Sequence, residues 1–364
     1  MNQDKPLLFF AKTHNPEDLE KWLELHPQVQ IVDSYQLQLR ELFETMFPAA
    51  RGDEQKMQHF LTQKLDNHQS SEIVGTWVYY PWKNVMIHLL AQQEYYDLRT
   101  NRNRELISRK EQEKLHQFKV AVFGMSIGSV IARAIIQGGC AQQMTICDND
   151  QFAISNFNRV PVDIFAIGQF KAERIAQDLY QLDPFLDLNV LKQKATKNSL
   201  KKLMDSPYKP QLIIDAIDDF PMKVLLRLEA KRNKIPLLMC TNLGDSVLID
   251  IERHDLEDVA PFHGLVKSEL LAKIMNEQLP PAEKKQLAVT LVGKHHVPLR
   301  ARYSVQQLGK TLAGRPQFFS SVAVGAGLAS FVVRQIALHK KIGSQQTRMH
   351  FPTLFGVEDM MEKI

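Results

Sequence analysis

The feature that most constrains the fold of this chain is an alternation of short apolar runs with helical segments, which begins at Phe118. The first run, 118–123, is rich in β-branched and aromatic residues and ends at Gly124, and a helical pattern follows over 126–137. Almost entirely apolar strands that alternate with helices are typical of a mostly parallel sheet covered on both faces. We therefore predict an α/β fold with further strands at 144–147, 188–191, 212–216 and 235–240 and further helices at 168–182 and 222–232.

The region before this core is predicted to be mainly helical. Leu39, Leu42 and Phe43 recur at three- and four-residue spacing, as they do along one face of a helix. An aromatic cluster at 75–82 interrupts this pattern and predicts one short strand stopped by Pro81.

The region after the core also turns helical, between a strand at 246–251 and a closing strand at 348–351. Its longest apolar stretch is 320–338, but the clean apolar part ends at Arg334, short of the roughly 20 residues that a bilayer span requires. We predict a buried helix there and no membrane partner. The chain is thus expected to have a mainly helical N-terminal domain at 1–98, an α/β domain at 99–260, and a helical region at 261–364 that completes that domain.

Composition narrows the function classes. The 364 residues are 44% hydrophobic and 24% charged, which is the balance of a globular protein and excludes wholesale disorder. The net charge of +4 is small for this size, so it indicates neither nucleic acid nor an anionic membrane as a partner. The three cysteines form no C-x-x-C pair, so we expect no zinc site; with no evident signal segment, we expect a cytoplasmic protein.

The turn after the first predicted strand predicts a nucleotide site. Small residues between Gly124 and Gly128 let backbone N–H groups approach phosphates at the start of a helix. Asp148, 20 residues after Gly128, ends the next strand, where a carboxylate meets ribose hydroxyls in nucleotide-binding units. The same turn also reads G-x-S-x-G, so a hydrolase with Ser126 as nucleophile is an alternative. It is disfavoured because a nucleophile elbow normally follows several strands of its sheet.

The stretch after Asp148 favours a triphosphate over a dinucleotide, because it offers several phosphate ligands in one loop leading into a helix. At the end of a later strand, Asp215, Asp218 and Asp219 bring carboxylates to the same edge of the sheet. Asp218 is suited to Mg²⁺, and capping of the next helix is its alternative role. The predicted phosphate ligands are Ser155, Asn156, Arg159 and Lys171.

The series D-x-D-x(4)-S-N-x-x-R, G-x-x-K and D-x-x-D, which starts with Asp148 and Asp150 and ends with Asp218, resembles the ThiF/MoeB-type, ubiquitin-activating-enzyme-like adenylyltransferases. The resemblance runs from about Arg99 to Arg253 and implies a Rossmann-like fold. It implies that Asp148 binds ribose and that Asp218 is linked to magnesium. Ser155, Asn156, Arg159 and Lys171 look like the family's phosphate-contacting set, and Lys223 is a weaker match to a basic residue after the aspartate.

The resemblance extends to residues outside this series. Arg102 or Arg104 is similar to an arginine that, in the family, reaches the triphosphate of the partner protomer, and a solvated linker charge is the alternative. Family members are commonly homodimers. The glycine turn is one residue shorter than the usual one. The aromatic patch at 77–82 and the 250–265 stretch look like a bacterial subgroup whose larger members carry a nitroreductase-like domain; flavin chemistry is not expected of the present chain.

The resemblance implies an enzyme that uses ATP and Mg²⁺ to activate a carboxylate as an acyl-adenylate, and one acceptor that it allows is the C-terminus of a small ubiquitin-like carrier protein. A non-catalytic nucleotide-binding scaffold and an NAD-dependent oxidoreductase stay open as alternatives. Cys240, at the end of a predicted strand, is placed to accept an acyl group as a thioester, although such a thiol is more often a small buried hydrophobe.

Overall fold

The computed structural model describes residues 4–11, 13–66, 73–276, 279–293 and 297–358. The chain divides into two compact units, described separately below. Unit 1 comprises Met1–Gln112 and Ala176–Leu186, and unit 2 comprises Glu113–Ile175 and Asp187–Ile364. The division at residues 98 and 260 that the sequence suggested stays a prediction.

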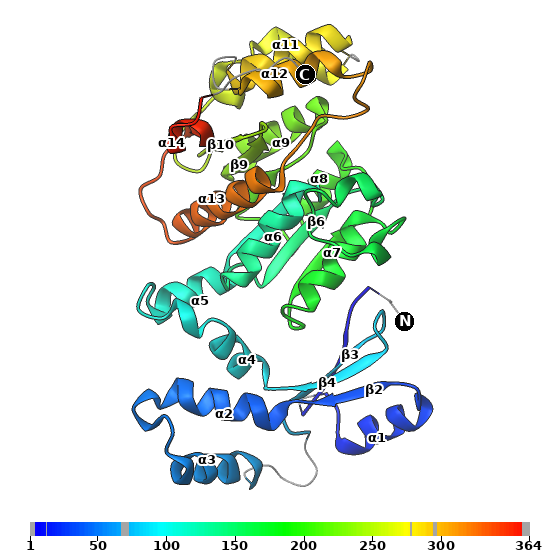
Figure 1. The fold of residues 1–364 in the computed structure, drawn as a ribbon, viewed down its shortest axis with the longest axis vertical. Helices are drawn as coiled ribbons and strands as arrows, with labels where there is room; N and C mark the ends of the chain where they lie inside the picture. The colour runs from blue at the N-terminus through cyan, green and yellow to red at the C-terminus, as the bar shows by residue number, and fades with distance from the viewer. Residues whose placement is uncertain (1–3, 12, 67–72, 277–278, 294–296, 359–364) are drawn as a thin grey trace. The chain divides into compact units, whose positions relative to one another are not determined.

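Unit 1 combines helices with a four-stranded sheet in the order β1-β3-β4-β2 (Figure 1). The helices of this unit agree with the predicted helical pattern. The strand predicted to stop at Pro81 is β3, which ends at Tyr80. Three further strands, β1, β2 and β4, were not predicted, so the expectation of a mainly helical region missed most of this sheet. Its elements are β1 (Leu7–Phe10), α1 (Pro16–Leu25), β2 (Gln30–Asp33), α2 (Tyr35–Met46), α3 (Glu54–Asp66), β3 (Thr76–Tyr80), β4 (Val85–Leu89) and α4 (Gln92–Arg99), with 3₁₀ turns at Pro48–Ala50 and Asn101–Asn103.

Unit 1 has its own apolar core. Leu39, Leu42 and Phe43 of α2 pack against Phe60 and Leu61 of α3. The three residues whose spacing predicted a helix therefore lie on the buried face of α2. A second cluster gathers around Phe9, Ile73 and Met86, with Trp22 and Trp77 against it.

Unit 2 is built on a seven-stranded sheet in the order β11-β10-β9-β8-β5-β6-β7. Neighbouring strands from β7 through β9 are parallel, and β10 and β11 complete the sheet antiparallel. The predicted α/β class with a mostly parallel sheet is confirmed. The strands are β5 (Lys119–Phe123), β6 (Gln143–Cys147), β7 (Asp187–Leu191), β8 (Leu212–Asp215), β9 (Leu237–Asn242), β10 (Ser246–Glu252) and β11 (Gln345–His350).

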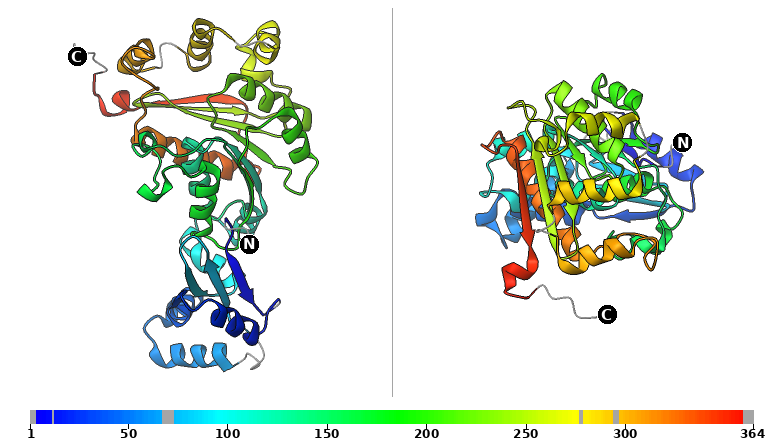
Figure 2. Two further views of the ribbon diagram at one scale, coloured as in Figure 1. Left: turned by 90° about the vertical axis from the view of Figure 1, so that its right-hand side faces the viewer. Right: turned by 90° about the horizontal axis from the view of Figure 1, so that it is seen from above.

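Helices cover both faces of this sheet. α13 lies along α6 and contacts β9 and β10, while α8 and α9 pack on the opposite face (Figure 1). β11, drawn in red, runs beside β10 (Figure 2). The helices are α5 (Arg109–Gln117), α6 (Ile127–Gln137), α7 (Lys171–Tyr180), which continues into unit 1, α8 (Lys197–Met204), α9 (Phe220–Asn233), α10 (Ser268–Asn276), α11 (Pro281–Val292), α12 (Leu299–Gln307), α13 (Phe319–Ala337) and α14 (Phe351–Phe355), with 3₁₀ turns at Ile154–Asn156, Ile164–Ala166 and Pro261–Gly264.

The helix predicted at 320–338 is α13. Among the described residues it is long and apolar enough, by length and composition alone, to cross a membrane. Val322, Ala326 and Val333 on its inner face are nevertheless buried in unit 2. A Cβ atom at Gly325 would lie 2.7 Å from Cys240 Sγ, so only glycine lets the helix approach β9 this closely. The predicted buried core helix is what the structure shows.

Candidate functional site

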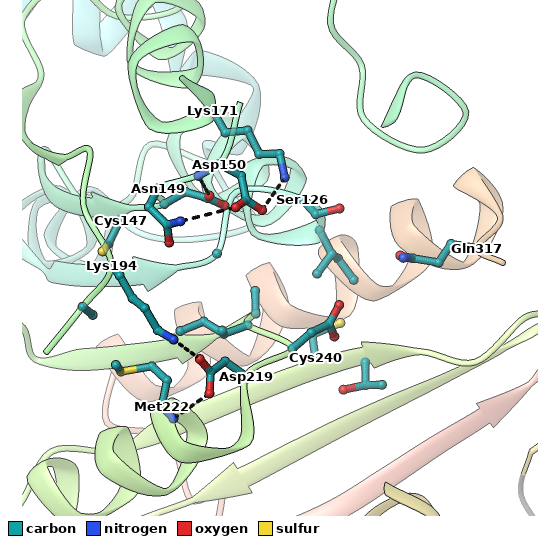
Figure 3. Close-up of a pocket in the computed structure, with 18 of the residues that line it drawn as sticks. Ser126, Cys147, Asn149, Asp150, Lys171, Lys194, Asp219, Met222, Cys240 and Gln317 are labelled. Atoms are coloured by element: carbon teal, nitrogen blue, oxygen red, sulfur yellow. Dashed lines mark hydrogen bonds and ion pairs between the residues drawn. The ribbon is translucent and has the colours of Figure 1, made fainter. Parts of the chain in front are cut away.

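A cavity of about 450 Å³ opens at the carboxyl ends of β5, β6, β8 and β9 in unit 2 (Figure 3). Parallel sheets bind ligands at this edge because the loops that follow the strands meet there. The structure brings seven of the predicted site residues together in the lining: Gly124, Ser126, Asp148, Asp150, Arg159, Lys171 and Asp218.

The turn between β5 and α6 forms the floor of this cavity. Gly124 has φ +91° and a Cβ atom there would collide with the carbonyl oxygen of Ala216, so the position requires glycine. Gly128 is not in the lining; it lets α6 pack closely on Val122 and Ala216. The buried Ser126 hydroxyl has no hydrogen-bond partner among the described residues. Without a base beside it, Ser126 is poorly suited to act as a hydrolase nucleophile but can bind a ligand.

Asp148 organises the next part of the site. Its two carboxylate oxygens accept hydrogen bonds from the backbone N–H groups of Met125 at 2.6 Å and Asp150 at 2.8 Å. Burial raises the pKa of Asp148 above its ordinary value, although these two donors oppose the shift. Lys171 Nζ in turn donates to Asp150 Oδ2 at 3.0 Å. Asp148, Asp150 and Lys171 therefore form one connected polar wall, of which Figure 3 labels Asp150 and Lys171.

The predicted phosphate ligands after Asp150 differ in position. Arg159 lines the cavity and donates to the Ser155 carbonyl oxygen at 2.8 Å. The Asn156 side chain is buried and accepts from the Ala153 N–H at 3.0 Å, so this oxygen holds the loop together. Ser155 is exposed and lies outside the lining. Of these three residues only Arg159 lies in the cavity wall, and the direct phosphate contacts of Ser155 and Asn156 stay predictions.

The three aspartates after β8 have three different surroundings. Asp215 is fully buried and paired with Lys223 at 2.9 Å and Arg227 at 2.7 Å. Asp219 is the residue that caps α9, through the Met222 N–H, and it pairs with Lys194. The side chain of Asp218 is 89% exposed and faces Arg315 Nη2 at 3.7 Å. The capping role therefore belongs to Asp219, which leaves the Asp218 carboxylate open to the cavity.

Asp218 also fits the magnesium that the family resemblance implies. Mg²⁺ is usually held by one or two carboxylates together with substrate phosphates, and Asp218 offers such a carboxylate beside cations suited to phosphate. The described residues contain no group of three or more His, Cys, Asp or Glu side chains that would form an all-protein metal site.

Several lining residues escaped the sequence analysis. Lys194 was not among the predicted site residues, yet it lines the cavity and pairs with Asp219. Arg315 and Gln317 come from the segment between α12 and α13, and Asn242 from the end of β9. A lysine just after a predicted parallel strand is a signal for Lys194. No local pattern marks Arg315, because long-range folding alone brings it to the cavity.

Arg102 and Arg104 lie in unit 1, in and just after a 3₁₀ turn. Arg104 Nη1 donates to the Thr45 carbonyl oxygen at 3.0 Å. The assignment of either arginine to a partner's triphosphate stays a prediction.

The three cysteines are buried. Cys240 touches the cavity, but burial raises the pKa of its thiol to about 12. A thioester requires the thiolate as nucleophile, which is scarce at neutral pH with such a pKa. Cys240 is therefore a poor acyl acceptor and packs against Gly325 of α13.

Comparison with known proteins finds a family similarity for part of the chain. Residues 99–246 match the model of the ThiF family. The chain contains a ThiF-family domain. The match to the ThiF-family domain confirms the family part of the resemblance, which was predicted from about Arg99 to Arg253, and the nitroreductase-like fusion stays a prediction.

The alignments with two individual relatives are longer than the ThiF-family match. The chain is 32% identical over 274 residues to an uncharacterized protein of Mycobacterium tuberculosis, MT1398, and the alignment covers 75% of this chain but only 37% of that protein. It is 24% identical over 190 residues to a tRNA threonylcarbamoyladenosine dehydratase of Haemophilus influenzae, covering 52% of this chain and 70% of the relative. Among solved structures, PaaA is 17% identical with a TM-score of 0.49, over 71% of this chain and 80% of that one.

Proposed function

We propose that this chain binds ATP with Mg²⁺ in the unit 2 cavity and transfers the adenylyl group to a carboxylate. The observation that carries the proposal is the lining itself. Arg159, Lys171, Lys194 and Arg315 meet an open carboxylate, Asp218, at the edge of a parallel sheet within a ThiF-family domain. A dinucleotide needs few cations beyond its pyrophosphate turn, so this set favours a triphosphate over NAD.

The charges of the lining favour a magnesium complex over bare ATP. Lys171 pairs with Asp150, Lys194 pairs with Asp219, and Arg315 faces Asp218, so each of these cations already has a carboxylate neighbour. A bare tetra-anionic triphosphate would meet the carboxylates as well as the cations. Mg²⁺ halves the charge of the nucleotide and gives Asp218 a partner, which makes the two sides complementary.

In the proposed reaction, a carboxylate oxygen of the acceptor attacks the α-phosphorus of ATP. The bond from that phosphorus to the oxygen that bridges to the β-phosphate breaks, and pyrophosphate leaves with the electron pair. The acceptor reacts as a carboxylate, so little proton transfer is required. The chain's own contribution is alignment and electrostatic stabilisation by Arg159, Lys171 and Lys194 as negative charge grows on the phosphates.

A second, smaller cavity supports a carboxylate as acceptor. It measures about 300 Å³ and shares Lys194, Asp218 and Asp219 with the first. Its other lining residues are the apolar Phe220, Pro221, Ile274 and Leu279 and the cationic Lys284. A carboxylate on an apolar chain, such as a carrier-protein tail, suits this mixture. A group carried on tRNA is the second acceptor class, because relatives are named as dehydratases of a modified tRNA nucleoside.

The test is calorimetric titration of the whole chain with a non-hydrolysable ATP analogue, with and without Mg²⁺, and with NADH. We expect binding of the ATP analogue that strengthens with Mg²⁺, and no binding of NADH. ATP–pyrophosphate exchange, assayed with carrier-protein tails and with tRNA, then separates an enzyme from a scaffold. NADH binding in place of ATP would overturn the proposal, and ATP binding with no exchange for any acceptor would favour the scaffold.

A further inference from the structure

The segment between α12 and α13, residues 308–318, forms part of the cavity wall and is tied down on both sides. Asn158 Nδ2 donates to the Gln317 carbonyl oxygen at 2.8 Å, and Asn242 Nδ2 donates to Gln317 Oε1 at 3.1 Å. Asn158 follows β6 along the chain and Asn242 ends β9, so the segment is held between two parts of the same site. Its position is therefore fixed by the loops that form the cavity.

Arg315 is the charged residue of this segment that faces the cavity. Its Nη1 donates to the Asn242 carbonyl oxygen at 3.0 Å, which fixes the guanidinium against the end of β9. Its Nη2 lies 3.7 Å from Asp218 Oδ1, too far for a good hydrogen bond. Pro316 follows and restricts the backbone of Arg315 to extended conformations, which limits the directions that the side chain takes. The side chain is 31% exposed, so a ligand can still reach it.

A second arginine, Arg159, lines the same cavity. Burial lowers the pKa of Arg159; the charge of Asp218 opposes this shift and the charge of Arg315 adds to it. Two guanidinium groups that feel each other's charge are unfavourable unless an anion lies near both. Asp218 is a carboxylate near both arginines, since its charge acts on Arg159 and its Oδ1 faces Arg315. An anion with more than one charged oxygen would satisfy both guanidinium groups better than this single, mostly exposed carboxylate.

We propose that Arg315 is a phosphate-binding residue of the nucleotide site, supplied by the 308–318 segment and paired with Asp218 until the nucleotide arrives. The proposal rests on the proposed function and adds a ligand-contacting residue from outside the matched family segment, which ends at residue 246. Arginine binds phosphate through two parallel N–H donors, a geometry that lysine cannot reproduce. When phosphate oxygens take the Arg315 donors, the Asp218 carboxylate is released to face the magnesium side of the complex.

The experiment measures the affinity of the whole chain for α,β-methylene-ATP with Mg²⁺ by calorimetry, and its affinity for adenosine by competition. For Arg315→Ala we expect the affinity for the triphosphate analogue to fall about 10- to 100-fold, the range for loss of a charge-assisted contact. Adenosine, which has no phosphate, should bind as it does to the unmodified chain. Arg300→Ala removes an exposed arginine from neighbouring α12 and should change neither affinity.

Two further measurements separate a phosphate contact from a structural role of the 308–318 segment. Arg315→Lys keeps the positive charge but not the two parallel N–H donors of arginine. It should therefore recover part of the triphosphate affinity that Arg315→Ala loses. Added guanidinium ion should restore triphosphate binding to Arg315→Ala but not to the unmodified chain. An Arg315→Ala chain that binds the triphosphate within two-fold of the unmodified chain, or that loses adenosine affinity equally, overturns the inference alone. An unmodified chain that binds no triphosphate overturns the proposed function, and this inference with it.

Discussion

Asp215 is the last residue of β8 and Asp218 follows it by three residues, and the surroundings of the two carboxylates are opposite. The Asp215 side chain is fully buried and sits between Lys223 and Arg227, whereas the Asp218 side chain is 89% exposed at the cavity. Burial alone raises the pKa of Asp215, but Lys223 and Arg227 outweigh that cost and hold it below its ordinary value. One carboxylate is committed to the fold and the other is open to a ligand.

The buried cluster continues away from the cavity. Arg227 is fully buried and binds Glu252 Oε1 at 2.5 Å as well as Asp215, and its guanidinium lies 3.8 Å from the Phe262 ring centre. Buried ions of this kind require partners on every side, because an unpaired charge in the interior is very costly. The comparison teaches that the kind of charged residue does not distinguish a binding residue from a structural one in this chain. What distinguishes them is how exposed the side chain is and whether all of its charged groups already have partners.

The largest effect that we predict comes from removing a charge from the buried cluster around Asp215. Arg227→Ala should lower the free energy of unfolding by about 3–5 kcal/mol, because it leaves Asp215 and Glu252 with uncompensated buried charge. Urea denaturation monitored by circular dichroism measures this. Arg232→Ala on the same helix, whose side chain is 69% exposed, should change stability by less than about 0.5 kcal/mol. Similar losses in the two variants would contradict the role given to the buried cluster.

The second prediction concerns the residues that are open to the cavity. Asp218→Ala and Lys171→Ala should each reduce ATP–pyrophosphate exchange by about 10²- to 10³-fold, or roughly 3–4 kcal/mol, by analogy with loss of one preorganised electrostatic contact. Asp218→Ala should leave the unfolding transition almost unchanged, since its side chain is mostly exposed. Lys197→Ala, at an exposed position on α8, is the matched control. Near-normal exchange in both cavity variants, with normal folding, would reject the assignment.

The sequence predicted the unit 2 sheet because its central strands are continuous apolar runs, such as Leu212–Asp215 with all four residues buried. It missed most of the unit 1 sheet, where β2 is exposed along its whole length and leaves no apolar pattern. In the site, spacing found Arg159 and Lys171, which lie in the same loop and helix start. The phosphate contacts of Ser155 and Asn156 stay predictions, because the orientation of these side chains depends on how the loop closes on itself. Arg315 was beyond reach, since only the complete fold brings it to Asp218.

The smallest effect concerns the edge of the buried cluster, where pH should reveal which charges are paired. His263 Nε2 lies 2.7 Å from Asp250 Oδ1, and this hydrogen bond raises the pKa of His263 above its ordinary value of 6.5, with the charges of Asp250 and Glu252 adding to it and burial and Arg227 opposing it. Because the folded-state pKa is raised, the pairing stabilises the fold fully below about pH 6.5 and is lost as pH rises through the folded-state value. The thermal unfolding temperature of the unmodified chain should therefore fall as the pH rises across that range. For His263→Gln the unfolding temperature should depend less on pH. Equal pH profiles for the two chains would contradict the pairing of His263 with Asp250, whose other oxygen accepts a hydrogen bond from Gln346 at 2.8 Å.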